Sequence, residues 1–133
     1  MQNTAKVFLV ALAVALLFIV CGEQGEPKEI TARHILIMYE GSARAPESVT
    51  RSKEEARELA EKVLQMVKDG GDFAELAQQY SDGPTKVRGG LLSPFGRGVM
   101  SKAFEDAAFA LKKGEVSGIV ETEFGFHIIK RVK

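Results

Sequence analysis

Residues 95–104, FGRGVMSKAF, place large apolar side chains close together between glycine-rich turns. They lie within residues 89–127, a segment that also holds Leu92 and ends at His127. An apolar cup beside a histidine can be part of a hydrophobic core or the lining of a pocket. The pattern of the remaining residues distinguishes a core from a pocket, and the prediction of the fold depends on that distinction.

Length and charge exclude some classes of protein. The chain has 133 residues, enough for one small domain, and is 45% hydrophobic and 27% charged, as globular proteins commonly are. Its 18 basic residues balance its 18 acidic ones; without residues 1–21, which hold Lys6 and no acid, 17 basic residues face 18 acidic ones. Such a chain has no basic excess for binding nucleic acid.

Residues 7–20 are an unbroken apolar run of 14 residues that follows Lys6. This length suits the apolar core of a signal peptide and is short for a membrane span, which needs about 20 residues. A buried helix is the alternative, but no polar residue interrupts the run to form a second face. We therefore predict that residues 1–21 are an export leader.

Cys21 is the only cysteine and directly follows the apolar run. Residues 18–21, FIVC, resemble a lipobox, whose cysteine is lipidated, although Ile19 and Val20 replace the usual small residues. An uncleaved anchor or another cleavage site is the alternative. Residues 22–28 would form a polar tether of at most about 25 Å. These features predict an extracytoplasmic protein anchored to a membrane of the cell envelope.

Hydrophobic periodicity divides residues 29–133 into alternating elements. Ser52 and Glu55 have the spacing of a capping box at the start of the clearest helix. We expect helices over residues 52–69, 72–80 and 101–111, and strands over residues 29–39, 91–93, 116–121 and 126–132. This order predicts an α+β domain with a small, mostly antiparallel sheet packed against helices.

Two loops carry polar residues that function could use. Residues 81–84 are a strong turn signal, in which Asp82 is either the hydrogen-bonding turn residue or a functional group. Residues 85–90 form a basic, glycine-rich loop without the lysine and hydroxyl residue of a phosphate-binding loop.

Seven blocks, in this order, resemble a parvulin-type peptidyl-prolyl cis-trans isomerase, or rotamase, over about residues 30–132. The blocks are ARHILI at 32–37, DFAELA at 72–77 with YSD at 80–82, RGG at 88–90, FGRG at 95–98 with Met100, FEDAAFAL at 104–111, GEVS at 114–117, and FGFHIIKR at 124–131. The resemblance implies a four-stranded antiparallel sheet wrapped by about three to four helices, an FKBP-like superfold.

The resemblance also implies roles for individual residues. His34 and His127 occupy the positions of two histidines on neighbouring central strands, and Thr122 that of a threonine near the second histidine. A leucine, a methionine and a phenylalanine line the proline pocket of the family; here they are Leu92, Met100 and Phe104, with Phe95 beside them.

The chain departs from the family pattern at three places. Where members often have Cys or Asp near the substrate carbonyl, Asp82 and Gly83 align, and only Asp82 can interact through a side chain. The usual GGDLG reads GGLLS at residues 89–93. Phosphate-selective members carry a basic cluster after the first strand, but Met38 takes one of its positions and Arg44 remains, so we expect no strong preference for phosphorylated substrates.

The implied reaction is rotation about an X–Pro bond, whose barrier is about 18–20 kcal/mol. An enzyme for this reaction must bind the twisted amide better than either planar isomer. We expect a non-covalent mechanism, because the only cysteine lies in the leader. We expect no cofactor, and no metal, because two histidines are too few ligands.

The expected partners are proline-containing exported polypeptides that the domain helps to fold. We expect a monomer that reaches the membrane through its N-terminal anchor and binds no nucleic acid. A catalytically weak, peptide-binding chaperone module with the same fold is the alternative, and a structural envelope scaffold is a third possibility. The scaffold would not need the pocket lining together with both histidines.

Overall fold

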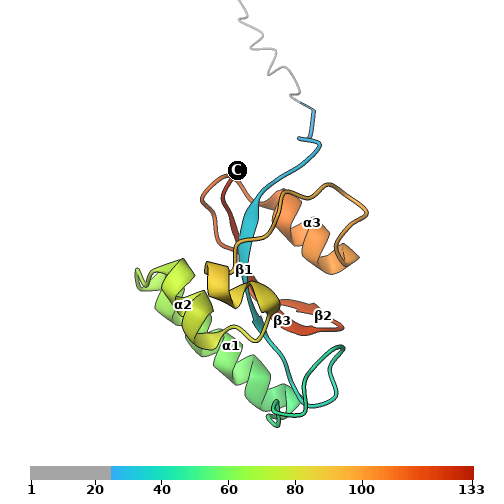
Figure 1. Cartoon of the computed structure of the whole chain (residues 1–133). Coiled ribbons are helices and arrows are strands. Elements are labelled where there is room, and N and C mark those ends of the chain that lie inside the picture. The colour runs from blue at the N-terminus through green and yellow to red at the C-terminus, as the bar shows by residue number, and fades with distance from the viewer. Residues whose placement is uncertain (1–24) are drawn as a thin grey trace, which may run out of the picture.

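The computed structural model describes residues 25–133, so the predicted leader and Cys21 lie outside the described residues. The domain is α+β (Figure 1), and its elements follow in the order β1 (Ala32–Ile37), α1 (Lys53–Lys68), α2 (Phe73–Tyr80), η1 (Pro84–Arg88), α3 (Lys102–Ala110), β2 (Val120–Thr122) and β3 (Gly125–Arg131). All three predicted α-helices are present. Among the described residues, no helix is both long enough and apolar enough to span a membrane.

The sheet has three antiparallel strands in the order β1-β3-β2, so the prediction of four strands is wrong. The predicted strand at residues 91–93 makes only isolated contacts with β1: Leu91 forms a bridge with Arg33, and the Leu92 amide donates to the Ala32 carbonyl at 3.0 Å. Two successive glycines, Gly89 and Gly90, turn the chain with φ of 64° and 79° just before this bridge. Pro94, which has no N–H to donate, separates this segment from a second isolated bridge between Phe95 and Ile30.

The strand predicted at residues 116–121 is shortened to β2. Ser117 interrupts its pairing with β3, because the Ser117 hydroxyl accepts the Ile129 amide at 2.9 Å. Only the single bridge from Val116 to Lys130 forms before this point. The predicted pairing of the last two strands is confirmed, with Thr122 opposite Gly125.

Residues 84–88, predicted as loop, form the 3₁₀ helix η1. Pro84 stands in its first turn, where a missing N–H costs no hydrogen bond, and Gly89 ends it in the left-handed conformation. The turn signal was therefore correct, but the residues after it are ordered and helical.

The strand register assigns side chains to the two faces of the sheet. His34 pairs with Ile129 and Leu36 pairs with His127, so these four side chains share one face. The opposite face carries the core residues Ile35, Ile37, Phe126 and Ile128, which pack with the apolar stripes of α1 and α2. Helix α3 lies on the other side of the sheet from α1 and α2 (Figure 1) and packs with Ile129. The two histidines therefore face the α3 side.

The caps of α1 and α2 agree with the sequence signals. Ser52 and Glu55 form both hydrogen bonds of the capping box, at 3.1 and 3.2 Å. The Asp72 carboxylate accepts the Glu75 amide at 2.9 Å and starts α2. These two helices cover the face of the sheet opposite the histidines, so the face that carries the histidines remains available for a site.

Candidate active site

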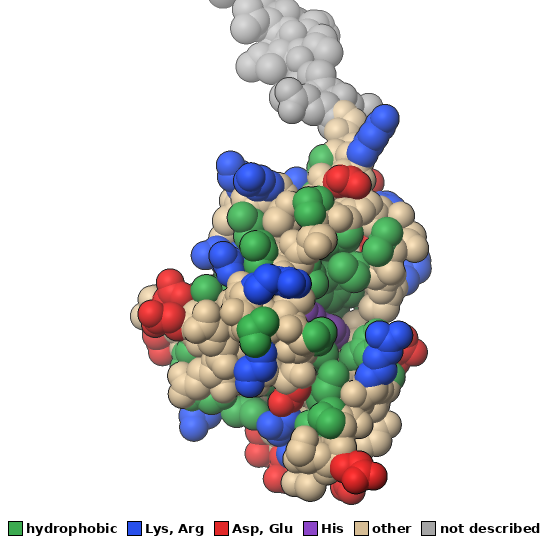
Figure 2. Space-filling view, viewed as in Figure 1, with side chains coloured by type: hydrophobic (Ala, Val, Ile, Leu, Met, Phe, Trp, Pro, Cys, Tyr) green, Lys and Arg blue, Asp and Glu red, His purple; other side chains and the backbone are tan. Residues whose placement is uncertain are grey.

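A pocket of about 520 Å³ opens on the face of the sheet that carries both histidines. Figure 2 shows histidine side chains within a hollow bordered by hydrophobic groups. The lining residues come from β1 and the loop that follows it, from η1 and the turns on either side of it, from α3 and the residues just before it, and from β3 and the turn that precedes it. They are His34, Leu36, Met38, Arg44, Pro46, Asp82, Pro84, Thr85, Leu92, Met100, Ser101, Phe104, Phe124 and His127.

The apolar cup at residues 95–104 is part core and part pocket. Leu92, Met100 and Phe104 line the pocket as predicted. Phe95 does not: it is 3% exposed and packs behind the pocket wall, with its ring centroid 6.0 Å from that of Phe104 and 6.1 Å from that of Phe109. Phe95 therefore supports the pocket-lining Phe104 from within the core.

The two imidazoles form one hydrogen-bonded chain with Thr122. The Nδ1 atoms of His34 and His127 are 3.1 Å apart, and His127 Nε2 lies 2.6 Å from the Thr122 hydroxyl. The Phe124 amide donates to the same hydroxyl at 3.2 Å, which holds Thr122 in place. Because one proton serves the contact between the two Nδ1 atoms, the rings must adopt complementary tautomers. The predicted pairing of the histidines, and the link from Thr122 to one of them, are present.

Burial keeps both histidines neutral at physiological pH. It lowers the pKa of His34 to about 4; burial, together with a smaller contribution from the nearby His34, lowers that of His127 to about 3. Phe104 presents a nearly perpendicular ring to both imidazoles, with centroids at 5.5 and 5.2 Å. The pair is therefore a set of fixed, uncharged dipoles at an apolar wall.

Asp82 lines the pocket and also fixes its rim. Its Oδ2 atom accepts the Met38 amide at 2.9 Å and Arg51 Nη1 at 2.6 Å, and Arg51 also donates to the Met38 carbonyl at 2.9 Å. The carboxylate thus ties the end of β1 to the loop before α1. Gly83, the other residue that aligns with the family's polar position, is buried, and a Cβ there would lie 3.8 Å from His34 Nε2.

Ser81 holds this turn against β1. Its hydroxyl accepts the amides of Leu36 at 3.0 Å and Gly83 at 3.2 Å, and the Asp82 amide donates to the Leu36 carbonyl at 2.7 Å. The turn is therefore bonded along the strand that carries His34, which places residues 82–85 at the pocket.

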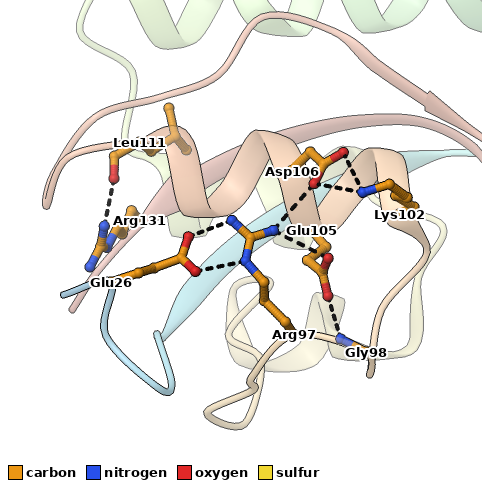
Figure 3. Close-up of polar contacts among 8 residues, drawn as sticks. All are labelled: Glu26, Arg97, Gly98, Lys102, Glu105, Asp106, Leu111 and Arg131. Atoms are coloured by element: carbon orange, nitrogen blue, oxygen red, sulfur yellow. Dashed lines mark hydrogen bonds and ion pairs between the residues drawn. The ribbon is translucent and has the colours of Figure 1, made fainter.

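A polar cluster around Arg97 holds the loop that carries Met100 (Figure 3). Glu105 is 7% exposed, accepts the Gly98 amide and contacts Arg97 Nη1 at 3.3 Å. Arg97 also pairs with Asp106 at 3.2 Å and with Glu26 from the predicted tether. The loop is thereby fixed to α3 and to the chain that enters the domain.

Sequence patterns missed several residues of the site. Arg51 lies in a loop of mixed charge, and no sequence pattern indicates that it pairs with the Asp82 carboxylate. Leu36 and Met38 were assigned to a strand, and alternation along that strand could have placed both on the His34 face.

Among the described residues, no group of three or more His, Cys, Asp or Glu side chains could hold a metal ion.

The fold and this site define a small α+β domain with an apolar peptide-sized pocket beside a neutral histidine pair. The family model for the PPIC-type PPIASE domain matches residues 16–133, and the chain belongs to this family of peptidyl-prolyl isomerase domains.

Curated relatives agree with this assignment. The chain is 50% identical over 114 residues to the peptidyl-prolyl cis-trans isomerase pin1 of Schizosaccharomyces pombe, covering 82% of this chain and 65% of that protein. It is 44% identical over 107 residues to the foldase protein PrsA 2 of Listeria innocua, covering 79% of this chain and 31% of that protein. The chain thus spans less than two thirds of either relative.

Solved structures share the fold. The peptidyl-prolyl isomerase ESS1 from Candida albicans superimposes with a TM-score of 0.76 at 34% identity, over 82% of this chain and 65% of that one. PrsA from Bacillus subtilis gives 0.64 at 36% identity, over 80% of this chain and 35% of that one.

Proposed function

We propose that the chain is a peptidyl-prolyl cis-trans isomerase that acts on X–Pro bonds by a non-covalent, twisted-amide mechanism. One observation carries this proposal: a single pocket contains both an apolar wall and the neutral histidine pair. The apolar wall is formed by Leu92, Met100 and Phe104. Membership of the isomerase domain family supports it independently.

The pocket suits a reaction that breaks no bond. A planar amide carries partial charges on its oxygen and nitrogen, and these shrink as the C–N bond twists. An apolar wall around the pyrrolidine ring therefore favours the twisted state over the planar isomers. The neutral histidines add no net charge that would stabilise the planar form, and they fix the position of the wall by their contacts with Phe104.

Asp82 would act on the carbonyl side of the substrate. A carboxylate near the carbonyl oxygen disfavours the partial negative charge that planarity places there, and so favours rotation. Its bonds to Arg51 and Met38 hold it in one position at the pocket rim.

A protease-coupled assay with an Ala-Ala-Pro-Phe peptide tests the enzymatic proposal. The full chain in mild detergent should accelerate cis-to-trans conversion above the thermal rate, in proportion to protein concentration. A folded protein that leaves the rate at the thermal background would remove the claim of catalysis and favour the alternative, a catalytically weak peptide-binding chaperone module. The GGLLS sequence at residues 89–93, which departs from the family pattern, is the observation that favours this alternative.

We further propose that the protein is exported, anchored through Cys21 and engaged in folding other exported polypeptides. Support comes from the apolar run that precedes Cys21 and from a relative whose name describes a foldase. Mass spectrometry of the membrane-extracted N-terminus should find a diacylglyceryl-modified cysteine. An unmodified Cys21 in a chain that keeps residues 1–20 would contradict lipidation.

The folding role has its own test. A secreted substrate protein whose refolding is limited by proline isomerisation should refold faster with the full chain present, since this step otherwise takes tens to hundreds of seconds. Unchanged refolding with a chain that is active on peptides would restrict the function to short or exposed segments.

A further inference from the structure

Thr85 has a buried hydroxyl without a partner. The residue is 8% exposed, and its Oγ1 atom is the one buried side-chain nitrogen or oxygen atom among residues 25–133 that forms no hydrogen bond. Burying a hydroxyl without a hydrogen bond costs free energy, so native structures usually provide a partner. An unpaired hydroxyl at this depth is therefore free to bond a polar group that enters the pocket.

The hydroxyl belongs to a residue that lines the pocket. Thr85 is the second residue of η1 and lines the same pocket as His34 and Leu92. The proposed twisted-amide mechanism does not use this hydroxyl. The unpaired hydroxyl thus belongs to the wall of the cavity where a peptide would bind, and a change of side-chain rotamer could turn it toward that cavity.

The backbone around Thr85 is held firmly, so its hydroxyl can move only by side-chain rotation. The Thr85 carbonyl accepts the Gly90 amide at 2.9 Å, and Pro84 fixes the chain on the other side. Gly90 in turn packs so closely on β1 that a Cβ there would lie 2.2 Å from the His34 carbonyl oxygen. A change of one threonine rotamer exchanges the positions of the hydroxyl and the methyl group.

A bound peptide would need such a group. Placing backbone amides in an apolar pocket is unfavourable unless their carbonyl oxygens gain donors. Asp82 is an acceptor whose Oδ2 is already engaged by Arg51 and Met38, and Gly83 has no side chain. A neutral hydroxyl beside these residues can donate to a carbonyl without adding charge to the pocket.

We propose that Thr85 is a substrate-binding residue whose hydroxyl donates a hydrogen bond to a backbone carbonyl of the bound prolyl peptide. This inference rests on the proposed function and adds to it a specific polar contact. A bound peptide pairs the hydroxyl that is orphaned in the free protein.

The proposal predicts opposite effects on stability and on binding. In the full chain, Thr85→Val removes the hydroxyl and keeps the shape, so the free protein should melt at the same or a higher temperature. Its Kd for the peptide Ala-Ala-Pro-Phe, measured by NMR titration, should rise about ten-fold, equivalent to about 1.4 kcal/mol. Thr85→Ser keeps the hydroxyl and should bind more tightly than Thr85→Val. Thr50→Val, at an exposed position outside the pocket, is the matched control and should change neither quantity.

Two outcomes would overturn the proposal. Wild-type affinity in Thr85→Val would show that the hydroxyl does not contact the peptide. A lower melting temperature in Thr85→Val would show that the hydroxyl has a partner in the free protein, such as a buried water molecule, and stabilises the fold. The titration measures binding without turnover, so it tests Thr85 even in a protein without isomerase activity; the protease-coupled assay of the wild type reports separately on the proposed function.

Discussion

The Nδ1 atoms of His34 and His127 lie 3.1 Å apart, although the residues stand 93 positions apart in the sequence. The strand register creates this contact, because Leu36 pairs with His127 and His34 lies two residues before Leu36 on the same face. Diagonal neighbours of this kind are within reach of aromatic side chains. Two neutral, buried imidazoles in contact have consequences for stability at low pH.

We predict that stability falls as the pH drops below about 6.5. The pKa of His34 is lowered to about 4 and that of His127 to about 3 in the folded protein, whereas an unfolded histidine keeps its usual pKa of about 6.5. The unfolded state therefore binds protons first, and each histidine removes up to about 1.4 kcal/mol of stability per pH unit in this range. Urea unfolding at half-unit intervals between pH 7.5 and 5 would measure the slope.

The control for this prediction uses a chain with one histidine fewer. His34→Asn should show about half the wild-type slope between pH 6.5 and 5, because the sequence contains only two histidines. Isomerase activity of the wild type should stay nearly constant from pH 8 to 6, since both rings are neutral throughout. A wild-type stability that is flat down to pH 5 would mean that the imidazoles are not buried as described.

Phe104 and Phe95 provide a matched test of pocket against core. Each is 3% exposed and belongs to the same apolar cluster, but only Phe104 lines the pocket. Phe104→Leu and Phe95→Leu should each lose roughly 1–3 kcal/mol of stability. We expect kcat/KM to fall about ten-fold or more for Phe104→Leu and to change little for Phe95→Leu. Equal losses of activity in both folded variants would contradict the division between pocket and core.

The sequence predicted most of the helices because their signals are local. The capping box at Ser52 and Glu55, and the apolar stripe that follows, are complete within one segment and form as expected. Residues 91–93 were predicted as a strand because Leu91 and Leu92 are apolar. Strand pairing depends on distant partners, and the turn at Gly89 and Gly90 together with Pro94 leaves room for isolated contacts only.

The site was predictable where a residue type has few alternative roles. The two histidines and the three wall residues could be assigned from the family resemblance and lie together. Phe95 could not be separated from Phe104 in advance, since both are phenylalanines in one apolar stretch and only packing distinguishes them. The Arg51–Asp82 pair and the orphaned Thr85 hydroxyl depend on three-dimensional distances that no spacing along the chain indicates.

Asp82 should contribute to stability and to catalysis in separable amounts. Asp82→Ala leaves the Met38 amide and Arg51 without their shared acceptor, and we expect a loss of about 1–3 kcal/mol. Asp82→Asn keeps an oxygen acceptor and should retain most of that stability. It removes the charge that we propose acts on the substrate carbonyl, so kcat should fall several-fold. Wild-type kcat in Asp82→Asn would leave Asp82 with a purely structural role.

Glu105 should contribute more to stability and to substrate binding than the other acidic residues around Arg97. Glu105→Ala removes the acceptor of the Gly98 amide, and we expect a loss of about 1–3 kcal/mol together with a several-fold rise in KM, because the loop carrying Met100 loosens. Asp106→Ala is the matched control: Asp106 also pairs with Arg97 but its side chain is 51% exposed, so stability and KM should stay near wild type. Melting curves and steady-state kinetics of both variants would measure these effects. An unchanged KM in Glu105→Ala would show that the loop carrying Met100 does not depend on the contact between Glu105 and Gly98.

A phosphate on the residue before proline should raise kcat/KM only slightly. Among the described pocket-lining residues, Arg44 is the only cation; it is exposed, and its guanidinium lies 5.9 Å from the Phe124 ring centroid. By the family resemblance, Met38 takes the position of a second cation, and the Asp82 carboxylate, which also lines the pocket, has the same sign of charge as a phosphate. One exposed ion pair contributes at most about 1 kcal/mol, so kcat/KM for a phosphoserine–proline peptide should lie within about five-fold of that for the alanine peptide. Arg44→Ala should abolish whatever difference remains, and a preference of a hundred-fold or more in the wild type would show that the pocket recognises phosphate through groups other than those described.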